Sequence, residues 1–386
     1  MANRSSDIQT QLIHAGEPDP RIAGAVALPV FQSATFEYAG QNSYHDLKYI
    51  RLNNTPNHQV LHAKLAAIAG GEAAVVAASG MAAITSALLS FLRSGDHLLV
   101  QDCLYGGTHT FVNHDLPSLG IAFDFVAGND PSSWESLLKP ETRVIYVETM
   151  TNPLLEVTDL EAVVRFAREH NLVSMIDNTF ASPVNFKPLG MGFDVELHSC
   201  TKYLNGHSDI VAGCAIGGED RIERIVDRMN HLGGCLDPHA CFLLYRGMKT
   251  LALRVRHQND NALGLSQLLE GHPAVAQVNY PGLDDHPQHA RAELLFEGCG
   301  GVLSFEVRGG VEAADRLIES LVLPISAPSL GGVETLITRP ATTSHSGMTT
   351  KERAQAGISD GLIRVAVGIE AADDLCDDFE QALARL

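Results

Sequence analysis

Basic residues are scarce in this chain of 386 residues. It has 27 Lys and Arg against 46 Asp and Glu, so its formal net charge is −19 at pH 7. Such a charge repels the phosphate backbone of nucleic acids and anionic lipid surfaces. The sequence shows no local basic patch that would oppose this repulsion. It therefore argues against nucleic acids and membranes as partners.

Paired cysteine motifs and targeting segments are also lacking. The seven cysteines form an odd number without a C-x-x-C pair, which argues against a disulfide framework and favours a reducing cytoplasm. Residues 1–19 lack a basic start followed by an apolar core, so no secretory signal is expected. The longest apolar stretch, residues 73–92, is broken by Ser79-Gly80 and fits a strand, a turn and a buried helix better than a membrane span.

The signatures of several ligand classes are absent as well. No G-x-G-x-x-G follows a predicted strand, and no G-x-x-x-x-G-K-[ST] occurs, so the usual marks of dinucleotide and nucleoside triphosphate binding are missing. His58 and His62 have the spacing of a zinc helix but lack the glutamate of the metalloprotease motif. A packing role is favoured for them, and no metal site is expected.

Short apolar runs alternate with segments of helical length from residue 72 onward. The predicted strands are 73–78, 97–101, 121–126, 143–148, 172–177 and 195–200, with helices such as 80–93 and 160–171 between them. Strands that are apolar throughout indicate a mainly parallel sheet with helices on both faces. Ligands of such α/β sheets bind at the carboxyl ends of the strands.

The pattern changes near residue 237. A connecting helix is predicted over 248–261, followed by strands at 275–280, 302–307 and 362–367 and a last helix at 373–385. This order predicts a second, smaller α+β domain from about residue 249. The first 45 or so residues have no strong periodicity and are expected to form an arm that packs on something else.

Three features at predicted strand ends could carry chemistry. Ser79-Gly80-Met81 would place backbone N–H groups at a helix N-terminus, where a phosphate could bind, although Gly80 could serve only a sharp turn. Lys202 has apolar and hydroxyl-bearing neighbours, which suggests a lysine held in a site rather than a solvated one. Asp177 could cap a turn, bind a metal or hold a protonated ring nitrogen.

One cofactor needs all three features. Pyridoxal phosphate requires N–H and hydroxyl donors for its phosphate, a carboxylate for its pyridine nitrogen and a lysine for its aldehyde. The combination of Gly80, Asp177 and Lys202 therefore favours this cofactor.

Further short motifs extend this pattern along nearly the whole chain. In order they are Ile13-His14-Ala15-Gly16, Gly24-Ala25-Val26, Tyr49-Ile50-Arg51, Ser79-Gly80-Met81, Tyr105-Gly106-Gly107-Thr108, Glu148-Thr149-x-x-Asn152-Pro153, Asp177-Asn178-Thr179, Ser199-x-Thr201-Lys202-Tyr203, Ser329-Leu330-Gly331-Gly332-Val333-Glu334 and Leu362-Ile363-Arg364-Val365. With these motifs the sequence resembles the cystathionine γ-synthase-like family of pyridoxal phosphate enzymes of cysteine and methionine metabolism.

The resemblance implies a fold and an assembly. The fold is the aminotransferase-like one (fold type I), with a mainly parallel seven-stranded sheet domain and a smaller α+β C-terminal domain. Residues 1–48 would form an N-terminal arm contacting a neighbouring subunit, 49–248 the cofactor-binding domain and 249–386 the C-terminal domain. The assembly would be a homotetramer of two dimers with shared active sites.

The resemblance also implies roles for single residues. Lys202 would form the internal aldimine, Asp177 would pair with the pyridine nitrogen and Tyr105 would stack on the ring. The remaining implied residues are Gly80, Met81, Ser199 and Thr201 around the phosphate, Tyr49 and Arg51 reaching it from the neighbouring subunit, and Arg364 on the substrate carboxylate with Ser329 and Asn152 beside it.

The implied reaction is γ-elimination or γ-replacement on an L-amino acid with a leaving group on Cγ. Lys202 would take the Cα proton, and Tyr105 or Tyr49 could assist as proton donor or acceptor. The alternatives are β-elimination as in cystathionine β-lyases, replacement as in O-acylhomoserine sulfhydrylases or cystathionine γ-synthases, and a catalytically silent binding protein.

Three departures from the family pattern concern the substrate. Gly107 stands where methionine γ-lyases carry a cysteine, and Pro328 where many cystathionine-handling members carry a glutamate. The stretch 49–57 differs from the usual Tyr-x-Arg-x-x-Asn-Pro-Thr, and Lys48 replaces a common acidic residue. We therefore expect a remodelled pocket entrance and an unusual leaving group, possible examples being non-sulfur analogues such as canavanine.

Overall fold

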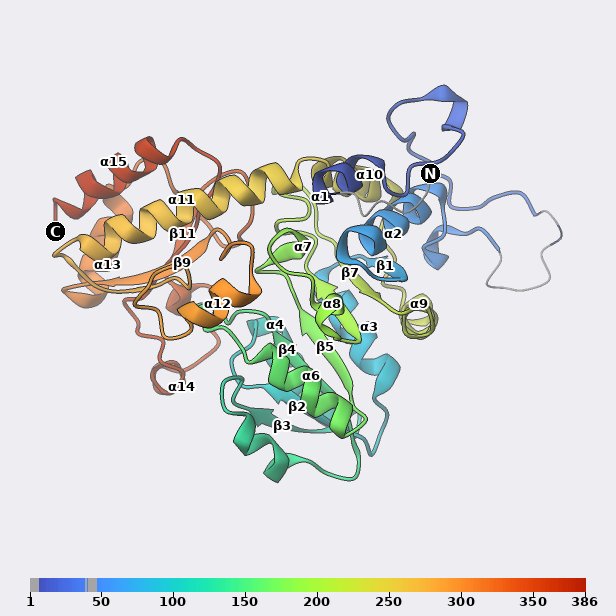
Figure 1. Ribbon diagram of the computed structural model, residues 1–386, viewed down its shortest axis with the longest axis horizontal. Helices are drawn as coiled ribbons and strands as arrows, with labels where there is room; N and C mark the ends of the chain where they lie inside the picture. The colour runs from blue at the N-terminus through green and yellow to red at the C-terminus, as the bar shows by residue number, and fades with distance from the viewer. Residues whose placement is uncertain (1–6, 39, 41–46) are drawn as a thin grey trace.

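The larger of two units is built around a seven-stranded sheet (Figure 1). The computed structural model describes residues 7–38, 40 and 47–386, without the side chain of residue 355. The strands are β1 (Ala73–Ala77), β2 (His97–Gln101), β3 (Ala122–Val126), β4 (Thr142–Glu148), β5 (Val173–Asp177), β6 (Val195–His198) and β7 (Gly213–Gly217). Their order across the sheet is β1-β7-β6-β5-β4-β2-β3.

The sheet is parallel except at β7. The pairs formed by β2 to β6 are parallel, whereas β7 runs antiparallel to both β6 and β1. The six strands predicted from apolar runs are present within about two residues of their expected ends. The same runs did not single out β7, because this five-residue strand is fully buried, has no alternation and begins and ends with the glycines Gly213 and Gly217.

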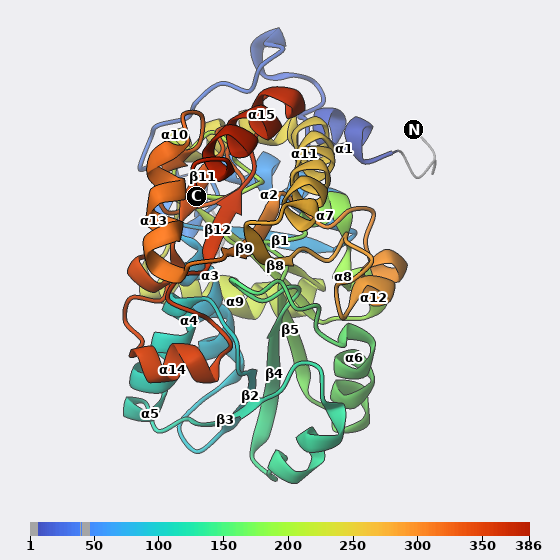
Figure 2. The same cartoon turned by 90° about the vertical axis from the view of Figure 1, so that its left-hand side faces the viewer.

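Helices cover both faces of this sheet (Figure 2). On one face α3 (Gly80–Phe91) and α9 (Glu219–Leu232) pack on apolar strand residues such as Val75 and Leu197. On the other face α2 (Pro56–Ala69) and α6 (Leu160–Glu169) pack on residues such as Val76 and Ile176. Because both faces are buried, the strands are apolar at consecutive positions, as the sequence indicated.

A second sheet of five strands forms the smaller unit. It consists of β8 (Val275–Asn279), β9 (Val302–Val307), β10 (Ile325–Ser326), β11 (Leu336–Thr338) and β12 (Ile363–Ala366), in the order β10-β11-β12-β9-β8. Helices α11 (Leu251–Gly271), α13 (Gly310–Ser320) and α15 (Ala372–Leu383) bury their apolar residues against one face. In register across the sheet, Arg364 lies beside Thr338 and Ser304.

Helix α11 is longer than the connecting helix predicted over 248–261. It follows α10 (Pro238–Met248) and continues past Gly264, where a glycine without neighbours within 4 Å of its Cβ position is tolerated inside the helix. Figure 1 shows α11 as the long yellow helix that leads from α10 to the second sheet. The predicted domain limit at residue 249 lies between these two helices.

Shorter elements connect the main ones. They are α4 (Gly106–Thr110), α5 (Leu116–Ser118), α7 (Ser182–Asn185), α8 (Pro188–Met191), α12 (His289–Leu295) and α14 (Thr350–Gln355). In addition, 3₁₀ helices lie at Ile22–Gly24, Ile50–Leu52, Pro131–Leu137 and Pro340–Thr342, and a π-helix at Phe111–Asp115.

The N-terminal segment contacts its own chain. Helix α1 (Ile8–His14) buries Ile8 and Leu12 in the cluster that contains α2. Glu17 accepts a hydrogen bond from Tyr245 and lies 3.6 Å from the Nζ atom of the fully buried Lys64. Residues 1–6, 39 and 41–46 of the predicted arm lie outside the described residues, and contact of the arm with a neighbouring subunit stays a prediction.

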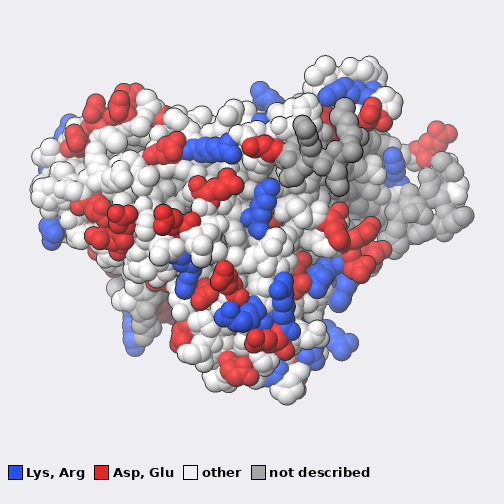
Figure 3. All heavy atoms as spheres, viewed as in Figure 1, with Lys and Arg blue, Asp and Glu red and all other residues white. Residues whose placement is uncertain are grey.

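Charged side chains of both signs are interspersed on the face shown in Figure 3. Lys and Arg lie among Asp and Glu there rather than in one continuous basic patch. Within the described residues, no helix has both the length and the apolar character needed to cross a membrane.

Candidate active site

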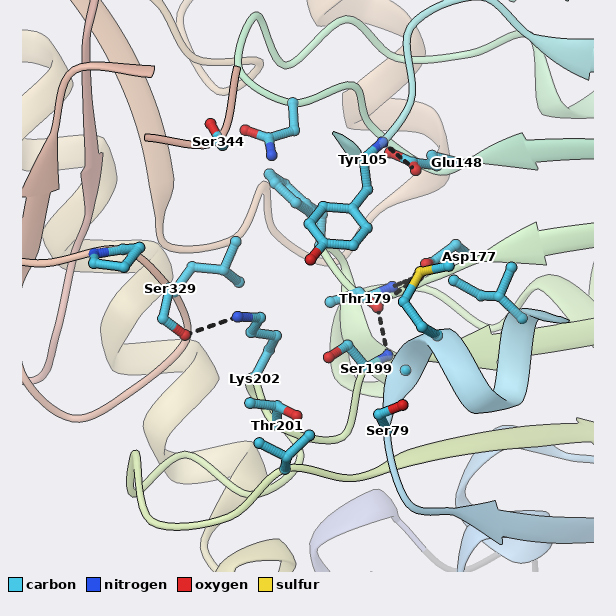
Figure 4. Close-up of a pocket in the computed structure, with 18 of the residues that line it drawn as sticks. Ser79, Tyr105, Glu148, Asp177, Thr179, Ser199, Thr201, Lys202, Ser329 and Ser344 are labelled. Carbon is cyan, nitrogen blue, oxygen red and sulfur yellow. Dashed lines mark hydrogen bonds between the residues drawn. The ribbon is translucent and has the colours of Figure 1, made fainter. Parts of the chain in front are cut away.

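A cavity of about 550 Å³ lies where the carboxyl ends of the parallel strands meet the second sheet (Figure 4). Ten of the residues selected from the sequence line it. They are Gly80, Met81, Tyr105, Asn152, Asp177, Ser199, Thr201, Lys202, Ser329 and Arg364. The cavity therefore brings together side chains that are up to 284 positions apart in the sequence, from Gly80 to Arg364.

The N-terminus of α3 forms one wall. The Ser79 side chain accepts a hydrogen bond from the N–H group of Ala82, and the first N–H groups of a helix have no partner within it. Gly80 lies close to Ser199, which directly follows β6. A Cβ atom added to Gly80 would be 2.9 Å from the Ser199 Cβ atom. Thus only glycine lets the helix start and the Ser199 hydroxyl group line the same space, where a phosphate could bind.

Lys202 follows β6 and extends into the cavity. Its Nζ atom donates a hydrogen bond of 2.8 Å to the Ser329 Oγ atom, which comes from the second unit (Figure 4). Burial, and secondarily the nearby charge of Arg364, lower the pKa of Lys202 to about 8. A lysine with such a pKa supplies a neutral amine near physiological pH, which is the form that attacks an aldehyde.

Asp177 ends β5 and is buried. Its Oδ1 atom accepts hydrogen bonds from the N–H and hydroxyl groups of Thr179, and the Thr179 oxygen accepts one from the N–H group of Ser199. The end of β5 is thus fixed to the start of the segment that carries Lys202. A buried carboxylate held in this way can receive a protonated ring nitrogen.

Glu148 is a second buried acid in the same cavity. Its Oε1 atom accepts a hydrogen bond of 2.7 Å from the N–H group of Tyr105. Burial, and then the charge of Asp177, raise the pKa of Glu148 well above its usual value. Burial raises the pKa of Asp177 as well, but the hydrogen bonds from Thr179 oppose that rise, so the neutral form is favoured more strongly at Glu148 than at Asp177.

Arg364 approaches from β12 of the second sheet. It is buried, and its Nη1 and Nη2 atoms donate to Asn152 Oδ1 at 3.1 Å and to the Ser329 carbonyl oxygen at 3.0 Å. Its Nε atom has no hydrogen-bond partner among the described residues. Burial lowers the pKa of Arg364 only to about 10, so the side chain remains a cation that can bind a carboxylate.

Two predicted site residues do not line this cavity. Tyr49 is partly exposed, and the Nη1 atom of Arg51 donates to the carbonyl oxygen of Asn230 in its own chain. Their predicted place in a neighbouring subunit's site stays a prediction.

Other residues of the cavity had no role assigned from the sequence. Glu148 and Thr179 stand within motifs that were recognised, and Glu148 closes an apolar strand just as Asp177 does, so the same signal would have selected it. Thr343 and Ser344 come from an irregular segment without any periodic signal.

The described residues contain no group of three or more His, Cys, Asp or Glu side chains placed to hold a metal ion. The donor set does fit pyridoxal phosphate. A helix start and hydroxyl groups, a buried carboxylate and a lysine amine face one cavity, and the close approach at Gly80 leaves space that a Cβ atom would disturb.

Comparisons with known proteins agree with this donor set. The family described as Cys/Met metabolism PLP-dependent enzyme matches residues 9–384. The chain belongs to this family. It is therefore a pyridoxal phosphate-dependent enzyme, as the sequence motifs predicted.

Individual relatives are similar over their full length. Cystathionine beta-lyase MetC of Bacillus subtilis is 40% identical over 387 residues, covering 100% of this chain and 98% of that protein. L-methionine gamma-lyase of Treponema denticola is 40% identical, covering 97% and 96%. The crystal structure of cystathionine gamma-lyase from Lactobacillus plantarum in complex with L-serine superposes with a TM-score of 0.93 at 38% identity and covers 98% of this chain and 99% of that one. The predicted fold class is thereby confirmed.

Proposed function

We propose that this enzyme catalyses γ-elimination on an L-amino acid that carries a leaving group on Cγ. One observation carries the proposal. Ser329 receives Lys202 Nζ on its hydroxyl group and Arg364 Nη2 on its carbonyl oxygen, so both groups meet at one residue. An amino acid whose carboxylate binds Arg364 has its Cα within reach of the Lys202 amine.

The roles of the side chains follow from their surroundings. Pyridoxal phosphate, when bound, withdraws electrons from the substrate Cα. Lys202, with its lowered pKa, accepts the Cα proton and can return it elsewhere on the substrate. Asp177 would hold the ring nitrogen, while Tyr105, half-exposed at the cavity, would lie on the ring and could give or take a proton.

The names of the relatives support elimination, and they include lyases that act at Cβ and lyases that act at Cγ. Two of the relatives are called gamma-lyases and one beta-lyase, so β-elimination is the second candidate. Replacement of the leaving group by a nucleophile, as in O-acylhomoserine sulfhydrylases or cystathionine γ-synthases, would use the same residues up to the last step.

Pro328 in the cavity and Gly107 beside it support an unusual leaving group. Pro328 lines the cavity and offers no side-chain acceptor for a distal amino group. At Gly107 a Cβ atom would lie 2.6 Å from the Tyr105 ring and 3.0 Å from the Met81 sulfur, so a cysteine would not fit without movement. Canavanine is therefore included among the candidate substrates.

The test is a substrate panel with product identification. It contains cystathionine, homocysteine, methionine, O-acetylhomoserine, O-succinylhomoserine and canavanine. We expect 2-oxobutyrate and ammonia from at least one of them, whereas homoserine would show that water replaces the leaving group at Cγ. Pyruvate as the main product would establish β-elimination instead, and a cofactor-loaded protein that turns over none of them would contradict the proposal.

We further propose a cytoplasmic homotetramer of two dimers. Two observations support it: Arg51 and Tyr49 do not line their own chain's cavity, and the seven cysteines are free thiols. Light scattering measures the assembly directly. Lys202→Ala and Arg51→Ala subunits, each inactive alone, should regain activity when refolded together, because some sites then combine an intact lysine with an intact arginine. Mixed subunits without activity would contradict shared sites.

A further inference from the structure

One buried carboxylate has no part in the function proposed above. Glu196 lies in β6, between the buried residues Val195 and Leu197, and its side chain is 0% exposed. Burying a carboxylate costs several kcal/mol unless hydrogen bonds and an opposite charge compensate it. Its partners are therefore informative.

Two donors face the Glu196 side chain. The Oε1 atom accepts from His198 Nε2 at 2.7 Å and from Asn178 Nδ2 at 2.9 Å, whereas Oε2 has no hydrogen-bond partner among the described residues. His198 is itself 1% exposed. Among the described residues, no other basic side chain lies within ion-pair distance of Glu196. Because a carboxylate oxygen only accepts, the Nε2 atom of His198 carries the hydrogen of this contact.

Both partners adjoin the candidate active site. Asn178 follows Asp177, and His198 precedes Ser199. The strands β5 and β6 are paired so that Asp177 lies opposite Leu197, one position before His198. Burial raises the pKa of Asp177, while the donors of Thr179 and the charge of His198 lower it.

Glu196, through His198 and Asn178, is thus connected to the ends of β5 and β6, where Asp177 and Ser199 lie. We propose that Glu196 is a positioning residue for the cofactor: it accepts hydrogen bonds from His198 and Asn178, and through these neighbours of Ser199 and Asp177 it keeps the Asp177 carboxylate in place for the ring nitrogen. This inference rests on the proposed pairing of Asp177 with that nitrogen.

The test compares two cofactors on the full-length protein. Glu196→Gln keeps the shape and the acceptor oxygen but removes the charge. Apoprotein is titrated with pyridoxal phosphate and with an analogue in which a C–H group replaces the ring nitrogen, and binding is followed by absorbance. We expect the variant to bind pyridoxal phosphate about tenfold more weakly, as for the loss of one charge-assisted contact. Its affinity for the analogue should change less than about twofold, because the analogue has no nitrogen for Asp177 to hold.

A purely structural role would weaken both cofactors alike, and that result would overturn the proposal. Glu196→Gln with unchanged affinity for pyridoxal phosphate would also overturn it. His198→Gln should reproduce the selective loss and decides the question if the first variant does not fold. The double variant should be no worse than either single one.

A matched control exists in the same sheet. Asp124 on β3 pairs with the buried His97, their Oδ2 and Nε2 atoms 3.2 Å apart, and neither residue lines the cavity. Asp124→Asn should leave both affinities unchanged. The unsubstituted protein tests the pairing of Asp177 with the ring nitrogen separately. If it binds both cofactors equally, that pairing is contradicted, and the proposal for Glu196 is not what has failed.

Discussion

Replacing Arg364 by lysine tests whether the guanidinium geometry binds the substrate carboxylate. The buried arginine donates to Asn152 and to the Ser329 carbonyl oxygen through two different nitrogens and keeps its Nε atom without a partner. One ammonium group cannot satisfy both acceptors and also hold a carboxylate in a bidentate way. Losing one to two hydrogen bonds to a charged group costs about 3 kcal/mol, or roughly 100-fold in affinity.

We expect this loss of roughly 100-fold in kcat/KM, mainly through a higher KM, because the carboxylate carries the same charge in substrate and transition state. Steady-state kinetics on the best substrate of the panel measures it, and absorbance titration checks that cofactor affinity is unchanged. The control is Arg339→Lys, because Arg339 binds Asp315 and the carbonyl oxygen of Asp360 in the same unit. A KM within threefold of that of the unsubstituted enzyme would refute the clamp.

Three further predictions concern the other groups of the cavity. Because the folded chain lowers the pKa of Lys202 from 10.5 to about 8, the unfolded chain binds this proton more tightly between those values. The stability of the apoprotein relative to Lys202→Met should therefore rise as the pH increases from about 8 to 10.5, which thermal unfolding at several pH values measures; a difference that falls in this window would refute the buried environment of the amine. Gly80→Ala places a Cβ atom 2.9 Å from Ser199 and should weaken cofactor binding about tenfold or more. Gly264→Ala, which meets nothing within 4 Å on α11, is the matched control, and equal effects of the two would argue against the phosphate cradle. Glu148→Gln should retain cofactor affinity and most activity, because burial and the charge of Asp177 raise the pKa of Glu148 and so favour its neutral form; a large loss would mean that its charge is needed.

The residues at strand ends could be predicted from sequence because each closes an uninterrupted apolar run. Asp177 and Gly80 are found in this way, and the position of Lys202 follows the same rule. The parallel order of the strands then brings the ends to one edge of the sheet. Site residues at this edge of the sheet can therefore be predicted from the sequence without knowing how the side chains pack.

Other parts depend on contacts that a local pattern does not contain. Glu196 lies inside an apolar run, where the sequence predicts only a strand, and its importance is visible only from its contacts with His198 and Asn178. Ser344 comes from a segment without periodicity and reaches the cavity through the packing of the two sheets. The roles proposed for Tyr49 and Arg51 require a second subunit.

The contact between the two sheets limits how far the site can change. Ser329 has a positive φ of 105°, a conformation that costs about 1 to 3 kcal/mol for a residue other than glycine. That backbone presents the hydroxyl group to Lys202 on one side and the carbonyl oxygen to Arg364 on the other. A substitution that relaxes this backbone would separate the amine from the guanidinium even if neither residue were altered. The amine of Lys202, which follows β6, and the guanidinium of Arg364 on β12 are therefore kept in register by one strained residue. A change of leaving group is accordingly easier to accommodate at Pro328 than at Ser329.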